Sequence, residues 1–276
     1  MTKKIFLTFL AFCSIVTAAQ AEEEAQQFEG FNLQGYTQNG SKSWDVKGET
    51  ADIMGNVIKL TNILANAYGE QQMNLTARNG TIDQGTGKMH LEKDVVITTD
   101  TGTQMTTNSL DWEREKDLVT TDDHVKIINK DMEATGTGII AHPNLKTAQM
   151  NEDVTVNVKS QQEQASGLTQ IQNVQITCDG PLEIDQAKQQ AVFNKNVVAI
   201  QEGKTLKADK IEVYFDQVTN QIKQMVCIGH VVIIQGGNTT YSEKAVYNAG
   251  EQKLILSGRP KLILQIGDGG LAPLGN

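Results

Sequence analysis

A short pattern that recurs five times along the chain constrains its fold more than any other feature. Each copy begins with one or two polar, turn-forming residues and continues with apolar residues two positions apart. This spacing is typical of a β-strand entered after a bend, because the side chains of a strand alternate between its two faces. The copies lie at residues 93–97, 123–127, 152–156, 195–199 and 229–233.

Upstream of each copy lies a second element, a strand-like segment that ends in an acidic or amide residue, and one more such segment follows the last copy. Successive ends are 28, 31, 43, 31 and 32 residues apart. A unit of this size holds two or three short strands that bury their apolar face only when units stack. The chain is therefore predicted to be all-β, a jelly roll or open rolled sheet of antiparallel strand repeats. The segments end at Asp83, Asp111, His142 (a degenerate member), Asp185, Asp216 and Asn248.

The longest step contains a polar stretch that suggests a division of the chain into two arrays in series. Removing about a dozen residues from this stretch restores the repeat length, so it is interpreted as a linker or insertion. We leave open whether the arrays form one continuous roll or two hinged units. The expected organisation is an N-terminal segment at 22–43, a first array at 44–160, a polar linker at 161–173, a second array at 174–266 and a flexible tail at 267–276.

Composition excludes several classes of protein. Hydrophobic residues make up 39% of the chain and aromatic residues 5%, so a core can form but must be built from aliphatic side chains. The net charge of −9 argues against nucleic-acid binding, which needs a surplus of lysine and arginine. No apolar run reaches the 18 or so residues that a membrane-spanning helix needs.

The first 21 residues have the pattern of a cleavable signal peptide. Lys3 and Lys4 precede an apolar run at residues 5–16, and Ala19-Gln20-Ala21 supplies the small residues of a cleavage site. We expect cleavage after Ala21 and export of the mature chain.

The sequence contains no pattern that predicts catalysis. A nucleophile elbow, a phosphate-binding loop and a histidine pair with metal-ligand spacing are all absent from the sequence. We therefore predict no catalytic residue, no metal site and no cofactor, although carboxylates such as Asp122 and Asp123 leave a glycosidase open as a minor alternative. Cys178 and Cys227 remain after cleavage, and they are either a disulfide or two buried free thiols.

Two families of lipopolysaccharide transport resemble successive parts of the chain. The first part resembles the LptC family and the second the LptA (OstA-like) family; together the resemblances cover roughly residues 44–266. The LptC-like motifs are Trp44-Asp45-Val46, residues 75–83, residues 91–95, Gly102-Thr103-Gln104-Met105, Leu110-Asp111 and Gly136-Thr137-Gly138; the LptA-like motifs are residues 176–182, Leu206-Lys207-Ala208-Asp209, Gly229-His230-Val231 and residues 256–260.

The resemblance implies a V-shaped, open β-jelly roll in the periplasm whose apolar interior holds the acyl chains of lipid A. It also implies head-to-tail pairing with other jelly-roll proteins through edge strands, in a bridge from the inner-membrane lipopolysaccharide ABC transporter to the outer membrane. The alternative is a structural or adhesive β-repeat protein that binds no lipid. The expected groove-lining residues are Val95, Ile97, Val125, Ile127, Val154, Val156, Val197, Val231 and Ile233.

Overall fold

The protein is built almost entirely of β-strands. A computed structural model describes residues 26–69, 72–163, 169–219 and 221–265, so the predicted signal peptide (1–21) and tail (267–276) lie outside the described residues. No helix among the described residues is long and apolar enough to span a membrane. The strands are β1 (Gln26–Tyr36), β2 (Lys42–Met54), β3 (Val57–Ala67), β4 (Met73–Asp83), β5 (Lys88–Thr99), β6 (Gln104–Glu113), β7 (Leu118–Ile128), β8 (Met132–His142), β9 (Thr147–Glu163), β10 (Thr169–Cys178), β11 (Leu182–Asp185), β12 (Gln190–Gln201), β13 (Lys204–Phe215), β14 (Ile222–Gln235), β15 (Asn238–Asn248), β16 (Lys253–Ser257) and β17 (Lys261–Ile263), with short 3₁₀ turns η1 (Arg114–Lys116) and η2 (Pro143–Leu145).

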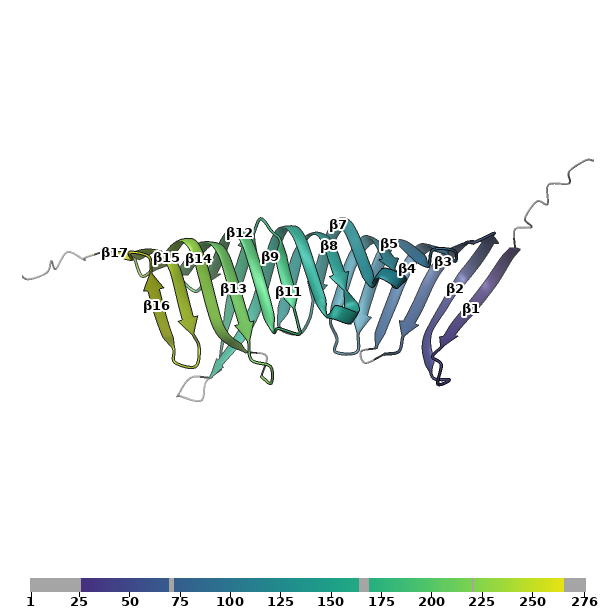
Figure 1. Cartoon of the computed structure of the whole chain (residues 1–276), viewed down its shortest axis with the longest axis horizontal. Coiled ribbons are helices and arrows are strands. Elements are labelled where there is room, and N and C mark those ends of the chain that lie inside the picture. The colour runs from purple at the N-terminus through teal and green to yellow at the C-terminus, as the bar shows by residue number, and fades with distance from the viewer. Residues whose placement is uncertain (1–25, 70–71, 164–168, 220, 266–276) are drawn as a thin grey trace, which may run out of the picture.

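All 17 described strands belong to one sheet, in which most strands adjacent in sequence pair antiparallel. β10 and β11 lie end to end between β9 and β12, and β16 and β17 lie end to end along β15. The strands run across an elongated body, with β1 at one end and β17 at the other (Figure 1). The prediction of an all-β fold of antiparallel strand repeats is therefore confirmed.

The recurrent polar residues lie inside the strands, not before them. In β5, for example, Lys93 and Asp94 have φ angles of 66° and 56°, and the pairing of β5 with β6 shifts between Glu92 and Val95. Such a shift is a β-bulge, which bends a strand sharply without ending it. Because most neighbouring pairs shift register near their middle, the sheet folds along a crease into two facing walls.

The crease is built from valines that alternate with small side chains. The crease row, as we call it, contains cross-strand partners such as Val95 with Thr107, Val125 with Gly136 and Val197 with Ala208. At Gly136 a Cβ atom would overlap the side chain of Met150, so only glycine fits there. The members of the crease row from β4 to β15 are Ala77, Val95, Thr107, Val125, Gly136, Val154, Cys178, Val197, Ala208, Val231 and Ser242.

Acidic and amide residues close the strand connections at one rim, as their spacing predicts. Asp83 Oδ1 accepts hydrogen bonds from the backbone N–H groups of Gly85 and Thr86, and Asp216 Oδ1 accepts from those of Val218 and Thr219. Asn248 Oδ1 accepts in the same way from Gly250 N–H. These local bonds hold the tight turns that return the chain into the sheet.

The polar stretch at residues 161–173 is not a linker in the parts that the structure describes. β9 and β10 pair without interruption from Val154 with Cys178 to Glu163 with Thr169. The two predicted arrays are consequently one continuous sheet. The prediction of a linker was wrong because a polar composition does not prevent backbone pairing, which needs no apolar side chain.

The interior is divided at a different place, between β6 and β7. Buried apolar residues form one cluster from Phe31 to Leu110 and another from Val125 to Ala245. Ladder pairing of β6 with β7 is interrupted between Thr106 and Asp111. Thr107 is buried there with no hydrogen-bond partner for its hydroxyl among the described residues. A polar interruption therefore separates the two buried clusters at the crease, well inside the first predicted array, whereas Met105 on the second wall packs against both clusters.

The two cysteines are free and buried, so the disulfide alternative was wrong. Cys178 lies in β10 and Cys227 in β14, with β12 and β13 between them. Three steps of about 4.8 Å separate these strands, whereas a disulfide needs Cα atoms within about 7 Å.

Candidate functional site

The most extensive feature of the interior is a set of apolar rows that run across the strands. Beside the crease row, each wall contributes a row of cross-strand partners that faces inward. We call them the first-wall row, exemplified by Met150, Leu182 and Phe193, and the second-wall row, exemplified by Ile97, Met105 and Ile127. Long rows of aliphatic side chains follow from the alternation of apolar residues, since partners in register point to the same face.

The nine residues predicted from sequence all occur in two of these rows. Val95, Val125, Val154, Val197 and Val231 lie in the crease row and are at most 1% exposed. Ile97, Ile127, Val156 and Ile233 lie in the second-wall row and pack against the same clusters. All nine therefore face the interior, and the crease valines are sealed by their neighbours.

Sequence reasoning missed the first-wall row. In β5, β9, β12 and β14 its members precede the register shift by a few positions, and in the strands paired with them they follow it. The same alternation of apolar residues could have revealed them. The first-wall row comprises Ala51, Leu60, Gly80, Leu91, Leu110, Thr121, Ile139, Met150, Leu182, Phe193, Ile211, Cys227, Ala245 and Leu256.

The second-wall row runs from one end of the described sheet to the other, and Thr240 in β15 is its one polar member. Leu33 in β1 begins it and Leu262 in β17 ends it, with exposed fractions of 36% and 58%. Between them the row includes buried residues such as Val46, Ala134 and Val156. The apolar interior is therefore closed in the middle of the sheet and reaches solvent at both ends.

Each wall could shelter a long hydrocarbon chain. Burial of one methylene is worth about 0.8 kcal/mol, so a chain of a dozen carbons gains roughly 10 kcal/mol when it is fully sheltered. Branched aliphatic and Met side chains line the rows, and Met adapts readily to irregular apolar partners.

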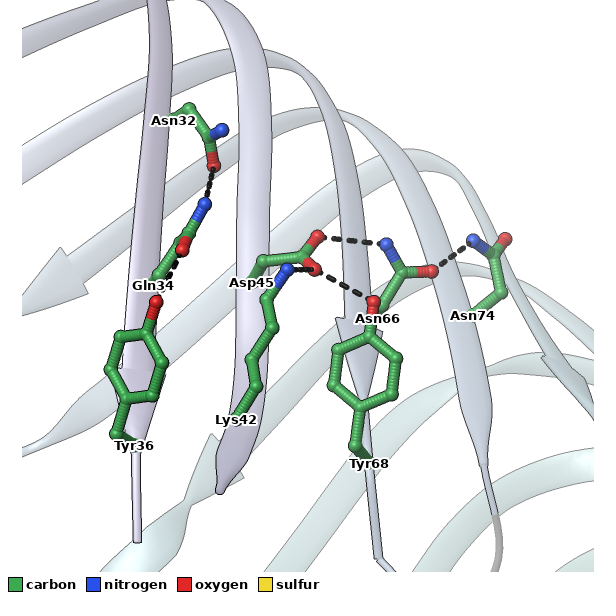
Figure 2. A network of polar contacts seen from close by, with 8 residues as sticks. All are labelled: Asn32, Gln34, Tyr36, Lys42, Asp45, Asn66, Tyr68 and Asn74. Atoms are coloured by element: carbon green, nitrogen blue, oxygen red, sulfur yellow. Dashed lines mark hydrogen bonds and ion pairs between the residues drawn. The ribbon is translucent and has the colours of Figure 1, made fainter. Parts of the chain in front are cut away.

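A polar network on the outer face joins β2, β3 and β4 near the N-terminal end (Figure 2). Asp45 is only 2% exposed; its carboxylate accepts hydrogen bonds of 2.8 Å from Asn66 Nδ2 and Tyr68 Oη and pairs with Lys42 Nζ. Asn66 in turn accepts a hydrogen bond from Asn74. The hydrogen bond from Lys42, followed by those from Asn66 and Tyr68, holds the pKa of Asp45 well below its usual range.

Every oxygen of Asp45 has a partner in this network, so we interpret it as a clamp across strands and not as a reactive site. No group of three or more His, Cys, Asp or Glu side chains within the described ranges is arranged to hold a metal ion. The interior rows are thus the strongest candidate for a functional site.

The two ends of the sheet expose unpaired strand edges. Among the described residues, β1 pairs only with β2, and β16 and β17 pair only with β15. Exposed apolar side chains accompany both edges, among them Phe28 and Leu33 on β1 and Leu262 and Ile263 on β17. Such edges are templates for the addition of another strand.

Two family models of lipopolysaccharide transport match successive parts of the chain. The family model of LptC-related lipopolysaccharide-assembly proteins matches residues 9–159. The model of the LptA and LptD N-terminal domain of lipopolysaccharide transport proteins matches residues 175–269. Comparison with curated proteins finds no match.

Among solved structures, the chain is similar to LptH, the LptA homologous periplasmic component of the lipopolysaccharide transport device from Pseudomonas aeruginosa. The identity is 15%, and the alignment covers 70% of this chain and 95% of that chain with a TM-score of 0.20. The first family model spans more than half of the sequence. The chain therefore belongs to the LptC-related family of lipopolysaccharide-assembly proteins, and an LptA-like region continues its sheet.

Proposed function

We propose that this protein is a periplasmic bridge component that holds the acyl chains of lipid A in its apolar interior during lipopolysaccharide transport. The second-wall row carries this proposal, because it is continuous and reaches solvent at both ends. A carrier that only stored lipid would need one opening, whereas a conduit needs two. Direction, from the inner-membrane ABC transporter toward the outer membrane, follows the role of the two families.

Edge-strand pairing would lengthen the bridge. The free edges of β1 and β17 offer backbone donors and acceptors to neighbouring jelly-roll proteins, which would continue both the sheet and its inward rows. In this arrangement the LptC-like and LptA-like parts need no junction between separate proteins, because β9 and β10 already pair.

Photocrosslinking at β16 tests the conduit. Leu254 pairs with Tyr247 and faces inward, whereas Ile255 pairs with Val246 and faces outward. Their exposed fractions are 47% and 51%, so a photoreactive residue at either position disturbs the fold equally little. We expect lipopolysaccharide to crosslink at Leu254 and not at Ile255.

A second variant pair examines the interior. Val231→Glu places a charge in the crease and should abolish crosslinking, whereas Val232→Glu on the outer face should preserve it. Equal crosslinking at Leu254 and Ile255, or no crosslinking at either, would refute the conduit and favour a structural β-repeat protein without lipid binding.

Proline substitutions at the C-terminal edge test strand pairing. Successive N–H groups of a strand point to opposite sides, so of Lys261→Pro and Leu262→Pro one removes a donor from the free edge. We expect that variant to lose binding to a partner jelly-roll protein in a pull-down assay. Retention of binding by both variants would count against edge pairing.

A further inference from the structure

The outer face of the second wall changes character along the molecule. Two outward-facing rows of cross-strand partners run parallel to the second-wall row. Across β2 to β10 these rows are mostly polar, with Asn74, Thr98 and Gln104 as successive partners in one of them. The exceptions there include Leu64, Ile128, Lys47 and Lys126. From β12 onward, exposed apolar and basic side chains predominate.

The exposed members of these rows in β12 to β17 define what we call the outer patch. Ile200, Thr205, Ile234, Thr239 and Ile263 follow one another in the first row. The second row consists, in order across the strands, of Val198, Lys207, Val232, Tyr241 and Lys261. The outer patch comprises Ile200, Lys207, Ile234, Tyr241, Lys261 and Ile263.

Its apolar side chains are well exposed to solvent. Ile200 and Ile263 are 46% and 45% exposed, and Tyr241 is 42% exposed. Single exposed apolar residues scattered over a surface are common, whereas exposed isoleucines aligned in one row of a sheet form a contiguous patch. Such a patch is typical of an interaction surface.

The charge of the outer patch indicates the chemistry of its partner. Neither Lys207 nor Lys261 forms an ion pair with a carboxylate in the described part of the chain. The two rows contain no acidic residue between β12 and β17, whereas the same rows in the first half include Asp45 and Glu133. The patch is thus apolar and cationic.

The size of the outer patch argues against a protein partner. Four strand steps of about 4.8 Å and two rows about 7 Å apart describe a surface of only a few hundred Å². A stable protein interface covers about 800 Å² on each partner. A lipid surface has no such minimum, because shallow apolar contact and charge attraction act together at a membrane interface.

We propose that the outer patch docks the C-terminal half of the protein on the surface of an anionic lipid bilayer. Lys207 and Lys261 face the anionic headgroups, and Ile200, Ile234 and Ile263 enter the interfacial layer. Tyr241 has an apolar ring and a polar hydroxyl, which suits it to the same boundary. The bilayer contacts the outer face, so this docking is independent of lipid in the interior.

Vesicle flotation with the full chain tests the proposal. The probes are vesicles of phosphatidylcholine alone and of phosphatidylcholine mixed with phosphatidylglycerol. We expect binding to the anionic vesicles only, and its loss when salt shortens the Debye length to a few ångströms. Because each lysine near an anionic surface contributes about fivefold to binding, K207Q with K261Q should weaken it about 25-fold.

A matched control uses the polar section of the same rows. Lys47 and Ile128 occupy those rows in β2 and β7, and they are exposed like their counterparts in the patch. The variant Ile200→Thr with Ile234→Thr should lose vesicle binding and keep its circular dichroism spectrum, whereas Lys47→Gln with Ile128→Thr should bind like the parent protein.

Three outcomes would overturn the proposal: equal binding to both kinds of vesicle, equal loss in the control variant, or a change of oligomeric state in the patch variants without vesicles. The last would make the patch an interface between copies. Crosslinking of lipopolysaccharide at Leu254 should survive in the patch variants, so failure of the conduit and failure of the docking surface are distinguishable.

Discussion

Substitution of one crease valine tests whether the LptC-like and LptA-like parts form a single packed unit. Val154 lies in β9, within the residues matched by the LptC model, and its cross-strand partner Cys178 lies in the LptA-like part. Their exposed fractions are 1% and 3%, and both belong to the same buried cluster. The substitution Val154→Ala should therefore destabilise both parts at once.

The expected magnitude follows from the two methyl groups that are lost. Their transfer to water costs about 1.6 kcal/mol at 0.8 kcal/mol for each, and the cavity left in a tightly packed crease adds about 1 kcal/mol. The free energy of unfolding should thus fall by about 2–3 kcal/mol. With an m-value of about 3 kcal/mol/M in urea, the midpoint falls by roughly 0.7–1 M.

Urea unfolding measures the total change in the free energy of unfolding, and hydrogen exchange followed by mass spectrometry shows which strands are destabilised. We expect faster exchange in β10 and β12 as well as in β8 and β9. Val198→Ala removes the same groups from the outer face of β12 and should change the midpoint by less than about a third as much.

A double-mutant cycle with Cys178→Ala should give a coupling free energy above about 0.5 kcal/mol, since the two side chains are in contact across the strands. Faster exchange that stops at β9, or additive effects of the two substitutions, would show that the two parts pack separately and would refute the reasoning.

Three further predictions concern titratable groups. Burial raises the pKa of the Cys227 thiol to about 12, so iodoacetamide at pH 8 should label it only after unfolding, as mass spectrometry can establish; rapid labelling of the folded protein would contradict its burial. The hydrogen bond to Asp209 raises the pKa of His230, so NMR titration of Asp209→Asn should show a lower value. The stability that this pair adds is present below the unfolded pKa of about 6.5 and lost as pH rises through the folded value; an unchanged titration would exclude the interaction. Asp45→Asn should lower the melting temperature at pH 7, because the ionised carboxylate, whose pKa is lowered by its hydrogen bonds, stabilises the folded state there. That difference is present above the unfolded pKa of about 3.9 and should vanish as pH falls through the folded value, and a constant difference down to low pH would point to another cause.

The family boundary and the physical boundary of the interior do not coincide. The two family models meet near residues 159 and 175, where β9 and β10 pair continuously. The buried clusters instead divide between β6 and β7, next to Thr107 and Thr121. Evolutionary relationship follows the order of motifs along the chain, whereas packing follows which side chains meet across the sheet.

Local sequence determined the strands, the turns and the inward residues. Apolar alternation is a property of neighbouring residues, so it was sufficient to place all nine predicted side chains on the inner face. Acidic residues at the strand ends bond their own turns, which is why their spacing revealed the repeat.

Only the tertiary structure decided the continuity of the sheet, the state of the cysteines and the change of character along the outer face of the second wall. Each depends on register between strands, and register fixes which distant residues become neighbours. The distance between Cys178 and Cys227 depends on the two strands between them, and the outer patch exists because Ile200, Ile234 and Ile263 fall in line across β12 to β17. A linear pattern specifies the face on which a side chain lies, and the fold specifies what lies beside it.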